Sequence, residues 1–221
     1  LLENEEGAKE AAERHEICHG TIDSWLVFKL TEGKEYRTDY SNASRTQLFN
    51  IFDLKWDDEI CKLFGIDPAN MAEVTDSDAC FGETDFEGLL PHKIPIHGVL
   101  GDSHGSLFGQ GCLQPGMIKS TYGTGSSIMM NIGEKPILST HGVVTSLAWK
   151  IGGKVNYVLE GNLNYTGAVI TWLKDDLQII SSPGETGKLA KEAIQEDCLY
   201  LVPAFSGLGA PYWDSEARAS V

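Results

Sequence analysis

Long apolar runs and basic residues are both scarce in this chain, and each shortage removes a class of protein. A membrane-spanning helix needs about 20 consecutive apolar residues, and the sequence contains no such run, so we expect no membrane partner. The 221 residues include 17 Lys and Arg against 32 Asp and Glu, a formal net charge of -15. Without a basic stripe, neither nucleic acid nor an anionic lipid surface is an expected partner. A nucleotide remains compatible with this charge, because backbone N–H groups can hold its phosphates.

Closely spaced cysteine pairs and an initiating methionine are also missing. The five cysteines are Cys18, Cys61, Cys80, Cys112 and Cys198. An odd number with no Cys-x-x-Cys pair argues against a disulfide framework and a zinc site, so we expect a cytoplasmic protein with no protein-held metal. The first residues are acidic, unlike a signal peptide. Because they include no starting Met, we expect the chain to begin inside a longer protein.

The first half of the chain predicts helices separated by polar or loop-like stretches. Charge and apolar spacing predict helices over residues 3–16, 21–30 and 56–64, the last of them stopped by Gly65. The polar residues 38–45 could line a site, but a solvated loop with helix caps is the more frequent explanation. Residues 75–93 are expected to be rich in loops.

The second half predicts strands and then alternating helices and strands, which is typical of a mixed α/β fold. Strands are expected over residues 117–122, 127–131, 143–149, 154–160 and 199–202, with a hairpin turn at Gly152-Gly153. Helices are expected to open at Gly161 and Asn162 and to cover residues 182–195, before a Gly/Pro-rich loop at 203–213. The composition changes near residues 111–116, where we place a domain boundary.

One stretch, residues 94–131, combines an acidic residue with a glycine-rich turn. Ile96 to Leu100 is predicted to be a short buried strand, which places Asp102 at the strand tip and leaves Ser103 to cap the following helix. Further on, the turn Gly123-Thr124-Gly125 lies between two apolar runs, which predicts a hairpin. A carboxylate and a phosphate cradle are the minimum set of groups for moving a phosphoryl group to a hydroxyl.

The same residues also fit a rival class. The sequence from Gly101 to Gly105 matches Gly-x-Ser-x-Gly, the motif that places a serine nucleophile, here Ser103, between a strand and a helix in hydrolases. The later histidine is His141, and the acid between is Glu134, too near it in sequence for the usual triad. We therefore keep a serine hydrolase only as an improbable alternative. A second alternative is a non-catalytic nucleotide-binding module, which would not need Asp102.

Six stretches in order resemble the FGGY carbohydrate kinases, and within them the glycerol kinases. They are Gly-Thr-Ile-Asp-Ser-Trp-Leu (20–26), Thr-Asp-Tyr-Ser-Asn-Ala-Ser-Arg-Thr (38–46), Gly-Asp (101–102), Leu-Phe-Gly-Gln (107–110), Thr-Tyr-Gly-Thr-Gly (121–125) and Ser-Gly-Leu-Gly-Ala-Pro-Tyr-Trp-Asp (206–214). The resemblance implies part of an α/β kinase fold with two actin-like, ribonuclease H-like domains. Residues 1–112 would end the first, substrate-side domain, and residues 113–221 would begin the second, nucleotide-side domain.

The resemblance also implies roles for particular residues. Asp102 would be the general base that accepts the proton of the acceptor hydroxyl, with Ser103 beside it in the substrate site. Gly123, Thr124, Gly125 and Gly167 would contact ATP, which is expected with Mg²⁺. The acceptor would be a small polyol or sugar, and a homo-oligomer remains compatible with the sequence. Each residue also has a plainer explanation: Asp102 as a neighbour of a helix cap, the glycines as turn and packing residues.

Two positions depart from the pattern of the glycerol kinases. Ser103 follows the base where those kinases usually carry Gln, and Ser127 stands where they usually carry an aromatic residue. Two serines remove an amide and a ring from the acceptor pocket. This difference favours a polyol or ketose larger than glycerol, unless residues outside this chain refill the space. Because the missing parts of both domains complete the site, we expect the chain alone to be inactive.

Overall fold

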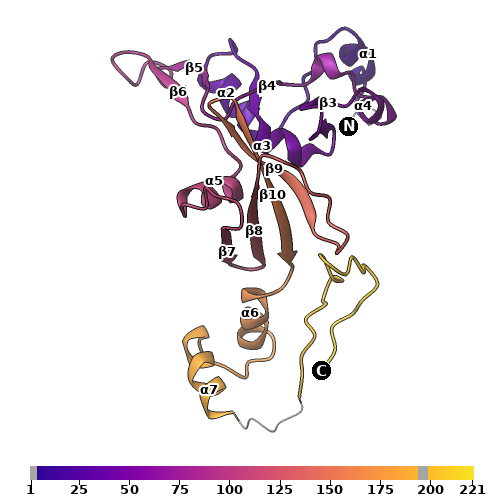
Figure 1. Cartoon of the computed structure of the whole chain (residues 1–221), viewed down its shortest axis with the longest axis vertical. Helices are drawn as coiled ribbons and strands as arrows, with labels where there is room; N and C mark the ends of the chain where they lie inside the picture. Colours follow the sequence, from indigo (N-terminus) through magenta and orange to yellow (C-terminus); the bar gives the residue numbers. More distant parts are fainter. Residues whose placement is uncertain (1–3, 194–198) are drawn as a thin grey trace. The chain divides into compact units, whose positions relative to one another are not determined.

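Figure 1 shows the computed structural model of the chain, which describes residues 4–193 and 199–221. The chain divides into two compact units whose residues interleave along the sequence. The first unit holds Leu1–Pro115, Asn131–Pro136 and Ser146–Val158; the second holds Gly116–Met130, Ile137–Thr145 and Leu159–Val221. Each unit is described by itself below.

Three helices predicted in the first unit are present, with narrower bounds. They are α1 (Ala8–Glu13), α2 (Ile22–Leu30) and α4 (Asp58–Leu63). The α4 helix starts later than predicted, because Trp56 belongs to a strand and the carboxylate of Asp57 caps the helix. Gly65, with a φ of 68°, follows its C-terminus as predicted.

Most of the polar stretch 38–45 is buried or half-buried, with Arg45 exposed at its end, so its interpretation as a solvated loop is wrong. Strand β1 (Arg37–Asp39) pairs in parallel with β4 (Glu73–Thr75), and the short helix α3 (Tyr40–Ala43) follows it directly. Asp39 caps this helix by accepting hydrogen bonds from the amides of Ser41 and Asn42. The expected helix cap is therefore present, but its residue, Asp39, is buried, because it also belongs to the paired strand β1.

The region from 75 to 100 also differs from the prediction. Strand β5 (Cys80–Thr84) lies within the expected loops and pairs antiparallel with β6 (Ile94–His97). The predicted buried strand 96–100 is wrong, because β6 ends at His97 and is mostly exposed. Gly98, with a φ of 79°, turns the chain out of extended conformation before the apolar run is complete.

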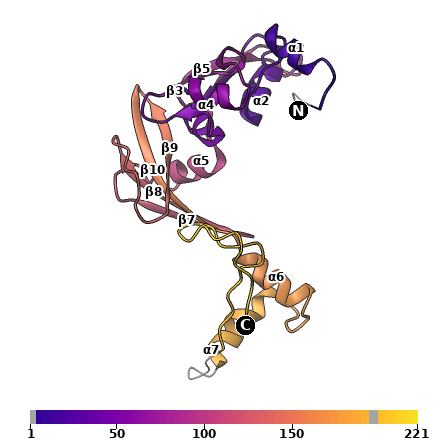
Figure 2. The ribbon, with the colours of Figure 1, turned by 90° about the vertical axis from the view of Figure 1, so that its right-hand side faces the viewer.

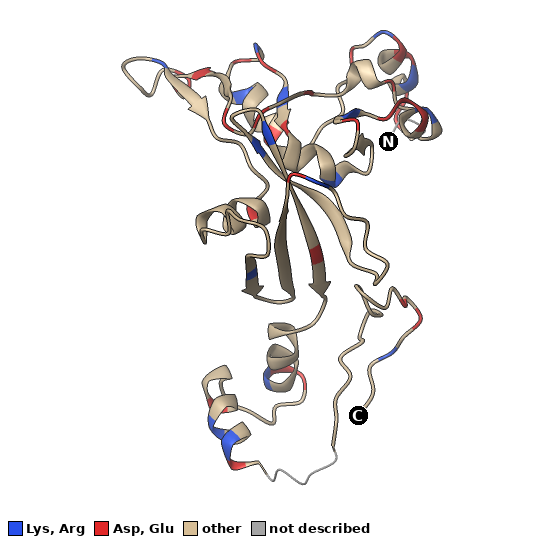
Figure 3. Cartoon of the chain, in the orientation of Figure 1, with Lys and Arg blue, Asp and Glu red and all other residues tan. Residues whose placement is uncertain are grey.

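Four of the five strands predicted in the second half are confirmed. They are β7 (Ile118–Tyr122), β8 (Ser126–Gly133), β9 (Val144–Ile151) and β10 (Lys154–Leu163), in the sheet order β7-β8-β10-β9. Gly152 and Gly153 have φ values of 56° and 75°, the positive values that a two-residue hairpin turn needs. Figure 3 shows that these strands carry few charged residues, whereas charges gather on the N-terminal helices.

A compact core ties α3 of the first unit to the parts of β9 and β10 in the same unit. Tyr40, Ala43, Phe49, Leu147 and Tyr157 are its buried members. The short hairpin β2 (Phe49–Asn50) and β3 (Lys55–Trp56) covers one side, and the rings of Phe49 and Tyr40 meet edge to face at 5.8 Å. Helix α5 (Asp102–Gly109) lies beside β9 (Figure 2). It packs there through Phe108, whose ring centroid is 5.4 Å from that of Trp149.

Lys150 adds a polar link at the edge of this core. Its Nζ lies 2.9 Å from Asp76 Oδ1 and 3.2 Å from the hydroxyl of Tyr40. Burial disfavours the ammonium, but the hydrogen bonds to Asp76 and Tyr40 outweigh that effect and raise the pKa of Lys150. The lysine thus remains a charged link between β9 and α3.

The C-terminal helices begin later than predicted. Gly161 and Asn162 belong to β10, and helix α6 (Gly167–Asp175) starts at Gly167. The helix predicted over 182–195 appears as η3 (Pro183–Glu185) and α7 (Thr186–Glu192), and its last residues lie outside those described.

The last predicted strand, 199–202, is wrong. Val202 makes only an isolated bridge to Ser220, so no ladder forms along that stretch. The Gly/Pro-rich loop 203–213 is confirmed as a run of turns and isolated bridges.

Two expectations concern the chain as a whole. Over the described residues, no helix combines the length and the apolar character that crossing a bilayer requires. Cys18, Cys61, Cys80 and Cys112 are free thiols, as expected for a chain without a disulfide framework.

Candidate active site

Asp102 is the first residue of α5 and is exposed to solvent. It does not lie at a strand tip, because residues 98–101 separate it from the end of β6. Ser103 is not the cap either: Gly101 occupies that position, and the amide of Ser103 donates to Asp102 Oδ1 at 2.6 Å. A carboxylate in the first turn of a helix interacts favourably with the helix dipole, and Asp102 occupies such a position.

The backbone directly before Asp102 is held at two points. The amide of Gly101 donates to Ser41 Oγ at 2.9 Å, and the amide of Val99 donates to the carbonyl of Ser77 at 3.1 Å. Gly101 also needs to be a glycine, because an added Cβ would lie 2.8 Å from His104 Nδ1. These contacts fix the path by which the chain enters α5.

The predicted phosphate turn is the tip of the β7–β8 hairpin. Strands β7 and β8 pair antiparallel up to Tyr122 and Ser126, and the amide of Gly123 donates to the carbonyl of Gly125 at 2.9 Å. Thr124 is exposed. Within the described part of the chain, no acceptor is recorded for the amides of Thr124 and Gly125. Two amides at an exposed glycine turn fit the oxygens of a phosphate group.

The carbonyls of this turn face the start of α6. The amide of Gly167 donates to the carbonyl of Gly123 at 2.9 Å, and the amides of Thr166 and Ala168 donate to that of Thr124 at 3.0 and 3.1 Å. Helix N-termini leave amides without intrahelical partners. Here the hairpin supplies those partners, so turn and helix form one rigid piece.

Glycine is required at two positions in this piece. A Cβ on Gly167 would lie 2.5 Å from the carbonyl oxygen of Gly123, and one on Gly125 would lie 2.6 Å from that of Leu163. Close approach of protein backbone therefore explains both residues, as the plainer interpretation held. Direct contact of Gly125 and Gly167 with ATP stays a prediction.

The two serines that depart from the family pattern lie in different units. Ser103 is half-buried on α5, and Ser127 is half-buried on β8. The Nζ of Lys119, a residue only 1% exposed, donates to Ser127 Oγ at 3.2 Å and to Thr121 Oγ1 at 3.0 Å. The sequence reasoning missed this lysine, although a lone cation in an apolar strand pattern was a visible signal.

The rival hydrolase finds no support in the geometry. The ring of His141 has Thr140 Oγ1 as its hydrogen-bonding neighbour at 3.2 Å. Metal-ligand clusters of three or more His, Cys, Asp or Glu are not found among the described residues. Mg²⁺ usually needs one or two carboxylates together with phosphate oxygens, so a nucleotide-borne Mg²⁺ does not require such a cluster.

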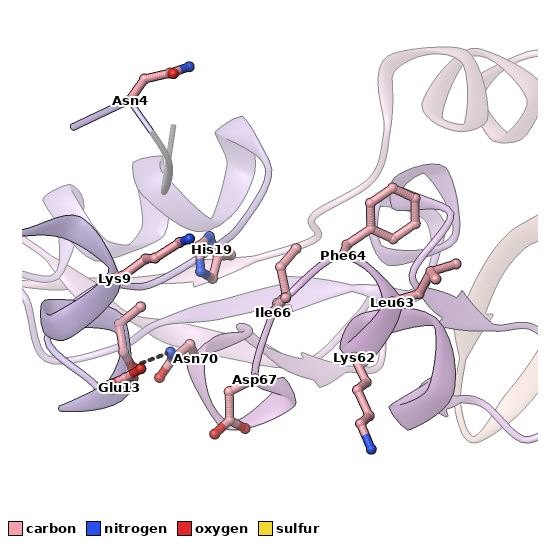
Figure 4. Close-up of a pocket in the computed structure, with 12 residues that line it drawn as sticks. Asn4, Lys9, Glu13, His19, Lys62, Leu63, Phe64, Ile66, Asp67 and Asn70 are labelled. Carbon is pink, nitrogen blue, oxygen red and sulfur yellow. Dashed lines mark hydrogen bonds between the residues drawn. The ribbon is translucent and has the colours of Figure 1, made fainter.

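A cavity of about 790 Å³ lies elsewhere in the first unit (Figure 4). Its lining includes Lys9 and Glu13 of α1, His19, and the stretch from Lys62 to Asp67. None of the predicted site residues contributes to it. The predicted site residues therefore lie at the start of α5 in the first unit and at the hairpin turn in the second unit, and not at this cavity.

Comparison with known proteins identifies the family. The N-terminal domain of the FGGY family of carbohydrate kinases matches residues 1–109, and its C-terminal domain matches residues 118–221. The chain belongs to the FGGY family of carbohydrate kinases. The resemblance predicted from the sequence motifs is thereby confirmed.

Curated relatives of the chain are longer than it is. Glycerol kinase 1 of Thermotoga maritima is 52% identical over 221 residues, which are 100% of this chain and 45% of the relative. Glycerol kinase of Carboxydothermus hydrogenoformans is 50% identical, again over 100% of this chain and 44% of the relative. The chain thus spans less than half the length of these relatives.

Solved structures confirm the predicted fold class. The crystal structure of Plasmodium falciparum glycerol kinase with ADP matches 100% of this chain and 44% of its own, with a TM-score of 0.89 and 36% identity. A xylulose kinase from Lactobacillus acidophilus matches with a TM-score of 0.78 at 22% identity, covering 90% of this chain and 40% of its own. The chain is part of the α/β, actin-like or ribonuclease H-like kinase fold.

The packing of α6 on the hairpin leads to a prediction for Gly167. Gly167→Ala should force the backbone of the hairpin away from α6, since the added methyl would lie 2.5 Å from the carbonyl oxygen of Gly123. That oxygen belongs to the backbone and cannot turn aside as a side chain could. We expect a clear fall in the free energy of unfolding, measured by urea denaturation. Gly187→Ala is the matched control, because Gly187 is also near a helix start and has open space around it; a loss as large in this control would contradict the packing explanation.

Proposed function

We propose that this chain is part of an ATP-dependent kinase that phosphorylates a hydroxyl of a small polyol or sugar. The observation that carries the proposal is the match of both FGGY domains, in order, along the chain. Two features of the structure support it: an exposed carboxylate in the first turn of α5, and an exposed hairpin turn with two amides available. We assign residues 1–112 to the substrate-side domain and 113–221 to the nucleotide-side domain of a cytoplasmic enzyme.

Asp102 would act on the acceptor. As a general base it would accept the proton of the attacking hydroxyl, so that the acceptor oxygen bonds to the γ-phosphorus while the bond from that phosphorus to the bridging oxygen breaks and ADP leaves. Its place at a helix start suits this role, because a rigid element holds the carboxylate at a constant position. ATP with Mg²⁺ supplies the transferred phosphoryl group.

The hairpin turn would act on the nucleotide. The amides of Thr124 and Gly125 can donate to phosphate oxygens, and the hydroxyl of Thr124 adds a third donor. Gly167 contributes by letting the helix approach the turn closely enough to hold those donors in place, and Gly123 provides the carbonyl that accepts from the amide of Gly167. Preorganised donors of this kind stabilise the charge that develops during phosphoryl transfer.

The two relatives described above, at 52% and 50% identity, are glycerol kinases, which supports glycerol as an acceptor. The serines at 103 and 127 support an acceptor site wider than one built with an amide and an aromatic ring. We propose a polyol acceptor in a widened pocket, with the choice between glycerol and a larger polyol or ketose left to the assays below.

The first prediction here concerns the chain by itself. It spans 44–45% of the relatives it matches, and α2 exposes Ile22, Trp25 and Leu26 to solvent. We expect the 221-residue chain to bind ATP weakly at best and to release no ADP with any polyol in a coupled assay. Turnover by the isolated chain would show that these residues alone complete the site, contrary to the proposal.

The second prediction tests the general base in the full-length protein. Asp102→Asn keeps the shape of the side chain but removes the base, so kcat should fall by about 10²- to 10⁴-fold while ATP affinity changes little. The matched control is Asp58→Asn, which removes an exposed carboxylate from the first position of α4. Near-parental kcat in Asp102→Asn would favour a non-catalytic nucleotide-binding module instead.

The third prediction tests the widened pocket. Ser103→Gln with Ser127→Phe should restore an amide partner and a packing surface, and a missing hydrogen-bond partner costs about 1 to 3 kcal/mol. The ratio of kcat/KM for glycerol over that for a pentitol should therefore rise roughly tenfold. The series to measure is glycerol, tetritols, pentitols and ketopentoses.

The control for this series lies on the other face of the same hairpin. Ser120 is on β7 opposite Ile128, whereas Ser127 is opposite Thr121, and neighbouring residues of a strand point to opposite faces. Ser120→Phe should leave the ratio unchanged. An unaltered ratio in the Ser103→Gln, Ser127→Phe double variant would remove the support for a widened pocket.

A further inference from the structure

We propose that the buried carboxylate of Asp39 positions the general base Asp102, acting through the hydroxyl of Ser41. The inference rests on the proposed function, since it assigns a positioning residue to the base named there. Asp39 belongs to the polar stretch 38–45, for which the sequence alone allowed either a functional site or a solvated loop. All groups involved belong to the first unit.

Asp39 has no exposure to solvent and accepts five hydrogen bonds. Its Oδ1 accepts from Ser41 Oγ, the amide of Asn42 and Asn42 Nδ2 at 2.8 to 2.9 Å. Its Oδ2 accepts from the amide of Ser41 at 3.0 Å and from Ser77 Oγ at 2.7 Å. A buried carboxylate persists only with such a set of donors, so each of these groups is fixed in direction.

Two of the five donors continue to the segment that precedes Asp102. Ser41 Oγ donates to Asp39 and accepts from the amide of Gly101 at 2.9 Å. Ser77 Oγ also donates to Asp39, while the carbonyl of Ser77 accepts from the amide of Val99 at 3.1 Å. The carboxylate thus holds residues 99–101 from two sides, and Gly101 is the residue bonded directly to Asp102.

The direction of each hydrogen bond explains why a carboxylate is needed. Ser41 has one hydroxyl proton, and Asp39 accepts it, which leaves a lone pair of Ser41 Oγ turned to the amide of Gly101. An amide at position 39 would present a donor to either Ser41 or Ser77. One of those hydroxyls would then have to reverse, and the corresponding link to the 99–101 segment would weaken.

Asp102 itself depends on this anchored backbone. It is exposed, and its recorded hydrogen bond is to the amide of the next residue, Ser103. No side chain of the described residues is recorded as holding its carboxylate. The position of the base therefore follows from the position of Gly101, and a small displacement of a reacting group is costly, with about 1 Å enough for a 10²-fold loss.

The experiment is a double-mutant cycle between Ser41→Ala and Asp102→Asn in the full-length protein. Ser41→Ala removes the relay hydroxyl, and we expect kcat to fall about tenfold with KM for ATP unchanged. In the Asp102→Asn background the same change should have no further effect on kcat, because there is no base left to position. A merely structural role would lower kcat by the same factor in both backgrounds.

The matched control is Ser44→Ala. Ser44 follows the same short helix, and its hydroxyl donates to the carbonyl of Ser41 at 2.8 Å without reaching Gly101. We expect less than about a twofold change in kcat. Equal effects of Ser41→Ala and Ser44→Ala, or additive effects in the cycle, would overturn the inference while leaving the proposed function intact.

Two further outcomes are assigned in advance. If Asp102→Asn keeps the parental kcat, the proposed base is wrong and the inference falls with it. If Ser41→Ala is not recovered folded, Ser77→Ala replaces it, since Ser77 Oγ is the second hydroxyl that Asp39 accepts from. The same criteria apply: loss of kcat that disappears in the Asp102→Asn background supports the inference, and additive loss overturns it.

Discussion

A carboxylate without contact to water needs a hydrogen-bond donor for nearly every lone pair. The buried side chain of Asp39 accepts five hydrogen bonds and so meets that need. Satisfying it joins the end of β1 and the start of α3, which are adjacent in sequence, to Ser77, 38 residues further along the chain. The backbone amide of Ser77 in turn donates a hydrogen bond to the backbone carbonyl of Lys150, on β9, at 2.7 Å. The first unit is organised around this charge, and the entry to α5 is one of the parts it fixes.

The second unit meets a similar requirement with backbone alone. The first amides of α6 need acceptors, and the carbonyls of Gly123 and Thr124 provide them. This arrangement excludes a Cβ at Gly167, and it leaves the opposite, amide side of the turn available at Thr124 and Gly125. One set of hydrogen bonds therefore both fixes the turn and determines which of its polar groups remain for a ligand.

Regular strands could be predicted from the sequence because their signal is local. The apolar runs of β7 to β10 and the Gly152-Gly153 turn carry the periodicity and the special φ that define a hairpin sheet. The failures have non-local causes. Asp39 and Ser41 of the polar stretch are buried, because distant partners at Ser77 and Gly101 complete their hydrogen bonds. Gly161 looks like a breaker, yet it continues β10 in a ladder with distant strands.

The candidate site divides in the same way. Asp102 and Thr124 could be named because their motifs are contiguous, and both lie exposed at the starts or turns of elements where a ligand can reach them. Lys119 and Ser41 could not, because their significance depends on contacts across strands or across about sixty residues of chain: Ser41 meets Gly101 at a separation of 60. A motif thus identifies a candidate reacting residue, whereas the residues that hold its backbone in place emerge only from the folded hydrogen-bond network. For that reason the polar stretch 38–45 carries more functional information than its composition suggested.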